Sequence, residues 1–259
     1  MQFKMENKIV VTKQQIVTGL KMLGLKAGDT ALVHSSLSRF GIVTGGVDTV
    51  IDALLEAVAP DGTIIVPTLT GSEKLCPANP PVFDVINSPC WTGKIPETFR
   101  KRSTAARSLH PTHSVSAIGA KAKYFTEGHE NCVTPCGLNS PYHKLALSDG
   151  YVLMLGVDLE CCTLFHTAEE LADVDYVNQK DFVTATVKDY QGRETKLKLK
   201  IHKYGDERNF QKMESILMEK CILKKGKIGN AEIRLIKAGP FLDLTIQILK
   251  QDSKFLLLH

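Results

Sequence analysis

The chain has 259 residues, of which 43% are hydrophobic and 23% charged, and its formal net charge at pH 7 is +4. This length can bury a large core, and the composition is that of an ordinary soluble globular protein. The charge is too small to indicate nucleic-acid binding, and no apolar run reaches the roughly 18 residues of a transmembrane helix. The start, MQFKMENKIVVTK, lacks the apolar stretch of a signal peptide. We therefore expect a cytoplasmic protein with no nucleic-acid or membrane partner.

The first part of the chain predicts alternating helices and strands. Apolar residues at helical spacing, bounded by a cap at Thr12 and a stop at Gly24, predict the first helix. Two buried strands with an amphipathic helix between them follow, at residues 31–33, 47–58 and 63–70. Strand, loop, helix and strand in this order indicate parallel pairing of the two strands with a right-handed crossover.

Residues 71–95 are rich in Pro, Asn and Ser and have no periodicity, so they predict a long ordered loop of the kind that carries function. After it the pattern predicts a short helix, two strands and another helix, at residues 95–102, 114–119, 151–156 and 165–174.

From about residue 182 the pattern changes to hairpins and helices. Two alternating runs around Gln191 predict a hairpin, and a helix, a second hairpin and a last helix follow at residues 209–220, 227–239 and 241–251. We therefore predict one domain over residues 1–259, with a mostly parallel α/β core to about residue 180 and an α+β portion from about 181.

The cysteines predict thiols rather than a disulfide framework, because their number is odd and their spacing irregular. They are Cys76, Cys90, Cys132, Cys136, Cys161, Cys162 and Cys221. Cys132 and Cys136 are four residues apart, but no second pair completes a zinc ribbon. Cys136 could be a nucleophile, yet no adjacent base or clear helix N-terminus activates it, so a structural thiol is the preferred interpretation.

Two polar loops are candidate binding segments. In VHSSLSRFG, Ser35 and Ser36 follow a buried strand, at the edge where α/β folds bind ligands, although turn-forming serines give the same pattern. In RSLHPTHSV, Arg107 could pair with a phosphate, and His110 and His113 could ligate a metal together with His166. A loop that only braces a site remains an alternative for this second segment.

The segment HTAEELADVDY predicts a general base. On a helix, His166 and Glu169 share a face because they are three residues apart. A carboxylate bound to one imidazole nitrogen fixes the tautomer and makes the other nitrogen more basic. An ordinary exposed pair at this spacing is the alternative.

This pair begins an acidic stretch within a basic protein. From Asp149 to Asp175 the chain has no Lys or Arg, and its acidic residues are Asp149, Asp158, Glu160, Glu169, Glu170, Asp173 and Asp175. Such a stretch suits an enzyme that acts on a polycationic amine, since the carboxylates can bind the ammonium groups of the substrate. Glu170 and Asp173 are the predicted substrate contacts.

Taken together, the motifs are far more specific than any one of them. In order they are VHSSLSRFG, GGVDTVIDALLEAVAPDGTIIVPT, WTGKIPETFR, RSLHPTHSVSAIG, GLNSPYHKL and VLMLGVDLECCTLFHTAEE. Their order and spacing over roughly residues 10 to 180 resemble those of the aminoglycoside 3-N-acetyltransferase family.

The resemblance implies an α/β/α sandwich distinct from the GNAT acetyltransferase fold. It implies an acyltransferase of antibiotic resistance that moves an acetyl group from acetyl-coenzyme A to the 3-amino group of a 2-deoxystreptamine aminoglycoside. It also suggests a homodimer and a transfer that needs no metal.

The resemblance also implies roles for residues. His166 is the expected general base, Glu169 its partner, and acetyl transfer is direct, in a ternary complex. Coenzyme A is expected at the two polar loops, on Ser35, Ser36, Leu37, Arg107, Ser108, His110, Thr112, His113 and Ser114. Donors near Ser35, Ser36 or Thr112 would stabilise the oxyanion.

The chain departs from the family where Cys136 replaces an aromatic residue, and the carboxy-terminal third aligns least. Three alternatives therefore remain: the same chemistry on a non-antibiotic amine, a metal-dependent hydrolase built on His110, His113 and His166, and a binding module. A binding module gains nothing from the pair His166 and Glu169, which makes it the weakest of the three.

Overall fold

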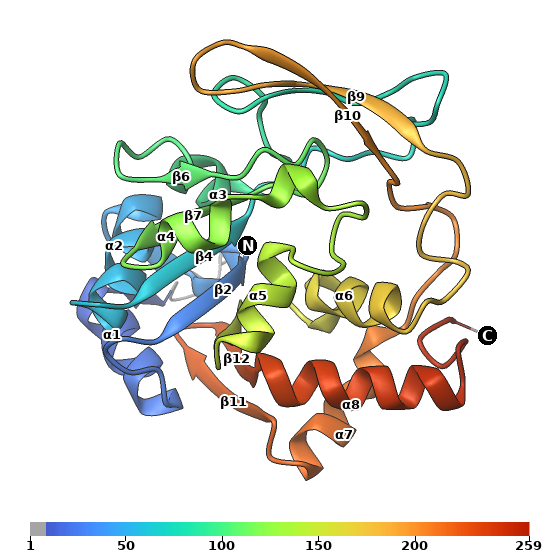
Figure 1. The fold of residues 1–259 in the computed structure, drawn as a ribbon. Coiled ribbons are helices and arrows are strands. Elements are labelled where there is room, and N and C mark those ends of the chain that lie inside the picture. The colour runs from blue at the N-terminus through green and yellow to red at the C-terminus, as the bar shows by residue number, and fades with distance from the viewer. Residues whose placement is uncertain (1–8, 259) are drawn as a thin grey trace, which may run out of the picture.

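The computed structural model describes residues 9–258; the first eight residues, on which the prediction of no signal peptide rests, lie outside this range. A seven-stranded sheet forms the centre of the molecule (Figure 1), in the order β11-β12-β8-β2-β4-β7-β6. Its strands are β2 (Thr30–Ser35), β4 (Thr63–Pro67), β6 (Ala106–Arg107), β7 (Val115–Gly119), β8 (Tyr151–Leu155), β11 (Leu223–Ile228) and β12 (Ala231–Lys237).

The pairing within this sheet is mixed. The predicted parallel pairing of β2 with β4 is confirmed, and β8 runs parallel to β2 on its other side. The outer pairings, β4 with β7, β7 with β6, β8 with β12 and β12 with β11, are antiparallel. Two residues connect β11 to β12, a connection too short for the crossover that parallel strands require. The α/β class is confirmed, and parallel pairing is restricted to the three central strands.

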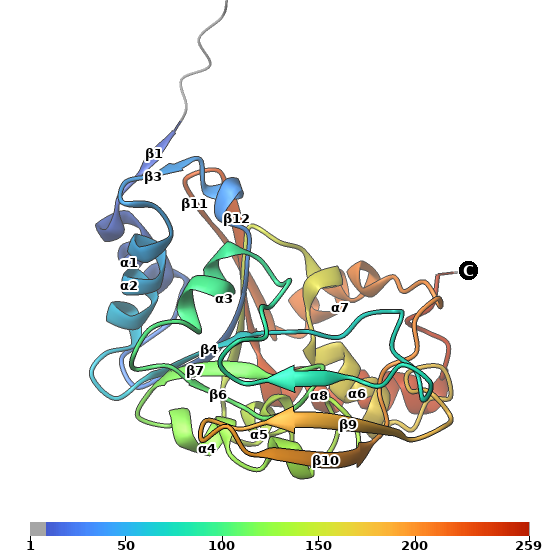
Figure 2. The same ribbon diagram turned by 90° about the horizontal axis from the view of Figure 1, so that it is seen from above.

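Helices cover both faces of the sheet (Figures 1 and 2). On one face lie α1 (Lys13–Leu23), α2 (Gly46–Val58) and α3 (Lys94–Phe99). The other face carries α4 (Ala122–Thr126), α5 (Pro141–Leu147), α6 (Leu164–Leu171), α7 (Met213–Glu219) and α8 (Ala238–Gln251). Within residues 9–258, every helix falls short of the length and apolar character that a bilayer-spanning helix requires.

The side chains of the central strands alternate between two hydrophobic cores. Leu32 of β2 packs in the core of α5, α6 and α8, whereas its neighbours Ala31 and Val33 pack in the core of α1 and α2. Val152 and Leu153 of β8 divide in the same way. Because successive strand residues face opposite sides, apolar runs without polar interruption are what a sheet covered on both faces needs.

The first helix forms as its sequence predicts. The Thr12 hydroxyl accepts from the amide of Gln15 (3.3 Å), and the Gln15 side chain accepts from the amide of Thr12 (2.8 Å), which completes a capping box. Gly24 ends the helix with φ 120°, a conformation that favours glycine.

The two portions expected on either side of residue 180 share the central sheet. β11 and β12 lie beside β8 at one end of it, and α8 packs against α5 and α6. The predicted hairpin β9 (Val183–Lys188) and β10 (Glu194–Leu199) forms a second, three-stranded sheet with β5 (Val82–Asp84), a strand inside the predicted loop (Figure 2). Near the N-terminus, β1 (Val10–Val11) pairs with β3 (Ile42–Val43).

In the part of the chain that the structure describes, four short 3-10 helices connect these elements. They are η1 (Leu37–Phe40), η2 (His129–Asn131), η3 (Leu159–Cys161) and η4 (Phe210–Lys212). η1 begins two residues after β2 ends, and η3 begins four residues after β8 ends, so both lie near the carboxyl edge of these strands.

Candidate active site

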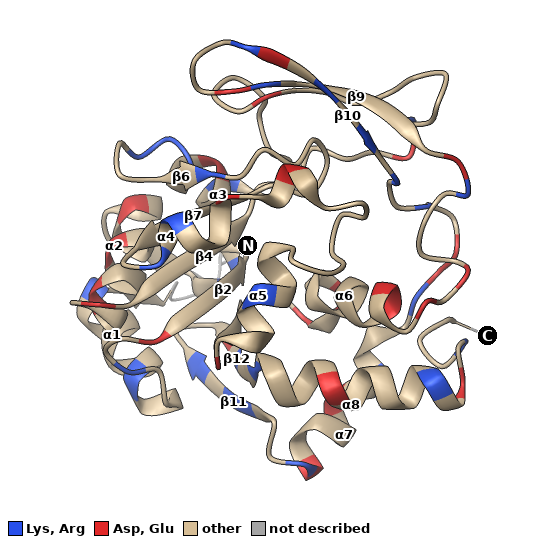
Figure 3. Cartoon of the chain, in the orientation of Figure 1, with Lys and Arg blue, Asp and Glu red and all other residues tan. Residues whose placement is uncertain are grey.

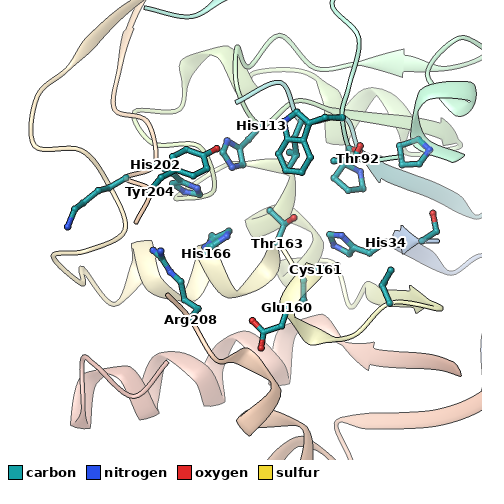
Figure 4. A pocket seen from close by; sticks show the side chains of 18 of the residues that line it. His34, Thr92, His113, Glu160, Cys161, Thr163, His166, His202, Tyr204 and Arg208 are labelled. Atoms are coloured by element: carbon teal, nitrogen blue, oxygen red, sulfur yellow. The ribbon is translucent and has the colours of Figure 1, made fainter. Parts of the chain in front are cut away.

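A cavity of about 400 Å³ opens at the carboxyl edge of the three parallel strands. Ser35 ends β2, Pro67 ends β4, and Val157 lies two residues beyond β8, and all three line the cavity. Its wall also includes His34, Leu69, Trp91, Thr92, Pro96, His113, Glu160, Cys161, Cys162, Thr163, His166, His202, Lys203, Tyr204, Gly205, Asp206 and Arg208 (Figure 4). This edge is where open α/β sheets bind ligands, and the volume suits a small-molecule ligand.

The predicted pair on α6 lies in the wall of this cavity. His166 Nδ1 is 2.6 Å from Glu169 Oε2, as their spacing of three on one helix allows. Glu169 is completely buried, whereas the His166 side chain is 25% exposed and lines the cavity (Figure 4). With Nδ1 bound to the carboxylate, Nε2 of His166 remains available to a substrate.

Glu169 is held in its charged form. Burial alone would raise the pKa of this carboxyl, but the hydrogen bond from His166 and the nearby charges of His166 and Arg208 outweigh burial, so the pKa is lowered. Arg208 Nε lies 3.3 Å from the second carboxylate oxygen. A buried carboxylate in this position stabilises positive charge on the imidazole.

His34 is a cavity residue that the sequence analysis did not single out. Its Nε2 and the Oγ of Ser35 are buried and have no hydrogen-bond partner among the residues that the structure describes. Burial, with a smaller effect of His166, lowers the pKa of His34 to about 3, so the ring is neutral at physiological pH. Buried polar groups normally have a partner, so two that lack one, on residues that line the cavity, are candidates for contact with a ligand. The position of His34 beside Ser35 at a strand end was the signal that could have found it.

The other residues of the serine loop lie further from the cavity. Ser36 donates its amide to the carbonyl of Leu155, which ties the loop to β8, and its hydroxyl lies 3.3 Å from that of Ser38. Leu37 is partly buried against the core of α1 and α2. Of the three predicted coenzyme A contacts in this loop, only Ser35 lines the cavity.

Arg107 is 3% exposed and packed among backbone carbonyls. Its guanidinium donates to the carbonyls of Val85 (3.2 Å), Ser88 (2.6 Å) and Thr68 (3.0 Å). Burial lowers its pKa to about 10, so it remains charged. These contacts occupy its N–H groups and agree with the bracing alternative rather than with a phosphate contact.

The rest of the RSLHPTHS loop is also buried. Ser108, His110 and Ser114 are at most 1% exposed, and the Nδ1 of His110 accepts from the amides of Thr112 (3.3 Å) and His113 (3.1 Å). His113 alone of the predicted loop residues lines the main cavity, while Thr112 borders a small neighbouring one. The loop therefore shapes the site chiefly by holding His113.

The two predicted substrate carboxylates do not line the cavity. Glu170 is almost fully buried, accepts from the amide of Cys136 (3.1 Å) and lies 2.7 Å from His202 Nε2. Asp173 is exposed beyond the end of α6. Glu160, from the same acidic stretch, and Asp206 are the carboxylates among the residues that line the cavity, and Glu160 is labelled there in Figure 4. Figure 3 shows acidic and basic residues distributed along the whole ribbon.

The carboxy-terminal third supplies part of the cavity wall, through residues that the sequence analysis did not single out. His202, Tyr204 and Arg208 enter the cavity from the segment after β10, and the ring centroids of His166 and His202 are 4.7 Å apart. Trp91 comes from the predicted functional loop and donates from Nε1 to the carbonyl of Gly71 (2.8 Å). No local pattern marks these residues, because they approach α6 only after folding.

The thiols remain unpaired in the structure. Cys136 is buried, and burial, together with the negative charge of Glu170, raises its pKa well above the ordinary value, which makes it a poor nucleophile. The predicted trio His110, His113 and His166 is not a group that could hold a metal among the described residues; His113, Cys136 and His202 lie close enough together to do so instead.

With this geometry in place, the comparisons decide the family. The family model described as aminoglycoside 3-N-acetyltransferase matches residues 32–250. The chain belongs to this family. The resemblance that the motifs predict is thereby confirmed, and with it the prediction that the protein is an enzyme, an acyltransferase.

Relatives of the acetyltransferase support the assignment over almost the whole chain. The SPbeta prophage-derived aminoglycoside N(3')-acetyltransferase-like protein YokD of Bacillus subtilis is 34% identical over 94% of both chains. The solved structure of AAC-IIIb, a binary complex with CoASH, has a TM-score of 0.78 at 27% identity, covering 93% of this chain and 97% of that one. AAC-VIa bound to sisomicin has a TM-score of 0.79 at 25% identity with the same coverage.

Proposed function

We propose that this chain transfers the acetyl group of acetyl-coenzyme A directly to the 3-amino group of a 2-deoxystreptamine aminoglycoside, with both substrates bound together. The contact between His166 Nδ1 and the buried Glu169, in the wall of the cavity, is the observation that carries this proposal. The proposal includes an α/β/α sandwich distinct from the GNAT fold, supported by the helices on both faces of the sheet, and a homodimer.

Glu169 and His166 together suit a general base. The amine nitrogen attacks the thioester carbonyl while His166 Nε2 accepts its proton, and Glu169 stabilises the imidazolium that forms. The C–S bond then breaks, and the protonated His166 returns the proton to the departing thiolate of coenzyme A. No acetyl group is attached to the enzyme in this scheme, so Cys136 needs no reactivity.

His34 and Ser35 are the candidate donors for the oxyanion. Both residues line the same cavity as His166, and their buried Nε2 and Oγ have no hydrogen-bond partner among the described residues. Donors held in place before the reaction stabilise developing negative charge without reorganisation, and this is often the largest contribution of an enzyme to its rate.

The substrates are proposed from the relatives and from the wall of the cavity. The solved structures named above hold CoASH and sisomicin, which supports acetyl-coenzyme A and an aminoglycoside here. Glu160 and Asp206 are in place to attract a polycationic amine. We place the thioester at the end of β2, near His34 and Ser35, and the amine between His166 and Asp206.

A thiol-release assay tests this function directly. Acetyl-coenzyme A would be combined with gentamicin, kanamycin, neomycin or simple amines, and the acetylated position determined by NMR. We expect turnover with the aminoglycosides, modification at the 3-amino group, and loss of turnover in His166→Ala. Turnover with simple amines only would instead support the same chemistry on a non-antibiotic amine. Trapping of an acetyl group on a cysteine would disprove direct transfer.

A further inference from the structure

Three metal-ligating side chains gather beside the cavity. His113, Cys136 and His202 are all buried, and one potential ligand atom from each lies within 4.8 Å of the other two. They come from three segments far apart in the sequence: the loop before β7, the segment before α5 and the segment after β10. Neither His166 nor Glu169 belongs to this group.

Both imidazoles are held by a second contact on one nitrogen. His202 Nε2 lies 2.7 Å from a carboxylate oxygen of Glu170, and His113 Nδ1 lies 3.0 Å from the hydroxyl of Thr112. Metal-ligating histidines commonly bind a carboxylate or another polar group through the nitrogen that does not face the metal. These contacts leave His202 Nδ1 and His113 Nε2 for an ion.

Glu170 provides an independent reason to expect a cation. It is almost fully buried and binds the Cys136 amide as well as His202, so it contacts two of the three residues. Among the described residues no Lys or Arg pairs with its carboxylate. A divalent ion bound to Cys136 and His202 would place positive charge beside this carboxyl and favour its charged form, which protonation would otherwise neutralise.

The ligand set selects the metal. One thiolate with two imidazoles is a typical zinc set, and zinc bonds of about 2.0–2.3 Å place tetrahedral ligand atoms roughly 3.3–3.8 Å apart. Side-chain rotations that close the cluster by about 1 Å satisfy this geometry. His113 and His202 also line the cavity, so a fourth position can be reached by water or a small ligand.

We propose that His113, Cys136 and His202 form a binding site for one Zn²⁺ ion. The Cys136 thiol loses its proton to solvent as the sulfur–zinc bond forms, and the two neutral imidazoles complete the protein ligands. The inference is independent of the acetyl transfer proposed above, in which no step involves a metal.

Cobalt substitution tests the site without reference to activity. Tag-free full-length protein, stripped by a chelator, would be titrated with Co²⁺ alone, and the near-ultraviolet band of a cobalt-bound thiolate followed before Zn²⁺ displaces it. We expect one equivalent of Co²⁺ and this band in the unmodified protein. Cys136→Ala should remove the band and weaken Zn²⁺ binding at least ~100-fold, whereas Glu170→Gln should keep the band and weaken binding ~10–100-fold.

Cys132→Ala is the matched control, because Cys132 is buried four residues away but lies outside the cluster. It should retain the band and the affinity. Zn²⁺ should raise the unfolding temperature of the unmodified protein and of Cys132→Ala. It should not raise that of Cys136→Ala or of the isosteric Cys136→Ser. The serine variant replaces the alanine variant in these tests if the alanine variant does not fold. Absence of the band, or a band that survives in Cys136→Ala or Cys136→Ser, would overturn the proposal.

Discussion

Glu169 has no contact with solvent, yet its pKa is lowered rather than raised. The reason lies in its two partners, since His166 and Arg208 each contact one of its carboxylate oxygens. A carboxylate that stays charged inside a protein can orient an imidazole and stabilise the charge that the ring gains. The interaction is useful only if the opposite nitrogen faces a substrate, as the exposure of His166 to the cavity allows.

Replacing either member of this pair should reduce turnover. We expect His166→Ala to lower kcat by ~10²–10⁴-fold, the usual contribution of a general base. Glu169→Gln should lower kcat at least ~10-fold with little change in either KM, because the amide cannot compensate the imidazolium charge. Steady-state thiol release by folded variants measures both effects. His143→Ala, on α5 outside the cavity, is the control, and an unchanged kcat in His166→Ala would exclude the base.

His34 should matter for the chemical step. If its Nε2 donates to the oxyanion, His34→Ala should lower kcat by ~10²–10³-fold, the range found when one such donor is removed. Ser38→Ala, in the same loop but outside the cavity wall, should leave kcat unchanged. Isothermal titration with coenzyme A separates this role from cofactor binding: weaker binding with unchanged kcat would count against the oxyanion role.

Helix α5 illustrates how one cap holds a segment of the site in place. Ser140 is fully buried; its hydroxyl accepts from the amide of His143 (3.2 Å) and donates to the carbonyl of Cys136 (2.9 Å). Pro141 follows in the first turn, where its missing N–H costs nothing. The same hydroxyl therefore starts the helix and fixes the backbone at Cys136.

Removing this hydroxyl should destabilise the protein. Ser140→Ala loses a cap and leaves a buried carbonyl unpaired, so we expect the free energy of unfolding to fall by about 2 kcal/mol. Ser148→Ala is the matched control at the other end of the helix, where a loss within about 0.5 kcal/mol is expected at this half-buried position. Urea unfolding of both variants measures the difference, and equal losses would show that the cap has no special role.

The sequence predicted those elements and contacts that depend only on residues close together in the chain. Helices α1 and α2 carry their own periodicity, and His166 meets Glu169 because one helix turn brings them together. Strand β5 has three residues and exists only through pairing with β9, far along the chain, so no local pattern predicts it. Arg208 reaches Glu169 from 39 residues away for the same reason. Arg107 seemed available to a phosphate because its carbonyl partners also come from distant loops.

For the molecule as a whole, Glu170 links pH to stability. Burial raises the pKa of this carboxyl to about 7, whereas in an unfolded chain a glutamate titrates near ~4.3. Below about pH 4 both states hold the proton. As the pH rises, the unfolded state releases it first, so stability is lost progressively until the pH passes about 7.

Glu170→Gln cannot titrate and should escape this loss. We subtract the unfolding free energy of the unmodified protein from that of the variant at each pH. This difference should rise by about 2–3 kcal/mol from pH 5 to pH 8, whatever its value at pH 5. Denaturant unfolding at both pH values, in the presence of a chelator, measures this gain. Groups that do not contact Glu170 titrate alike in both proteins and cancel, so a difference that does not change with pH would contradict the burial of an ionising Glu170.

The strand order of the central sheet also bears on how the protein is made. β8 is synthesised long before its neighbour β12, and nearly 80 residues separate their ends. Until residues 231–237 leave the ribosome, one edge of β8 has no partner, and an unpaired strand edge is a template for other chains. A nascent chain that stalls between these strands would be prone to misassociate, and a version shortened near residue 180 would keep that open edge permanently. The hairpin of β11 and β12, synthesised near the end of translation, therefore covers an edge of β8 that would otherwise stay exposed.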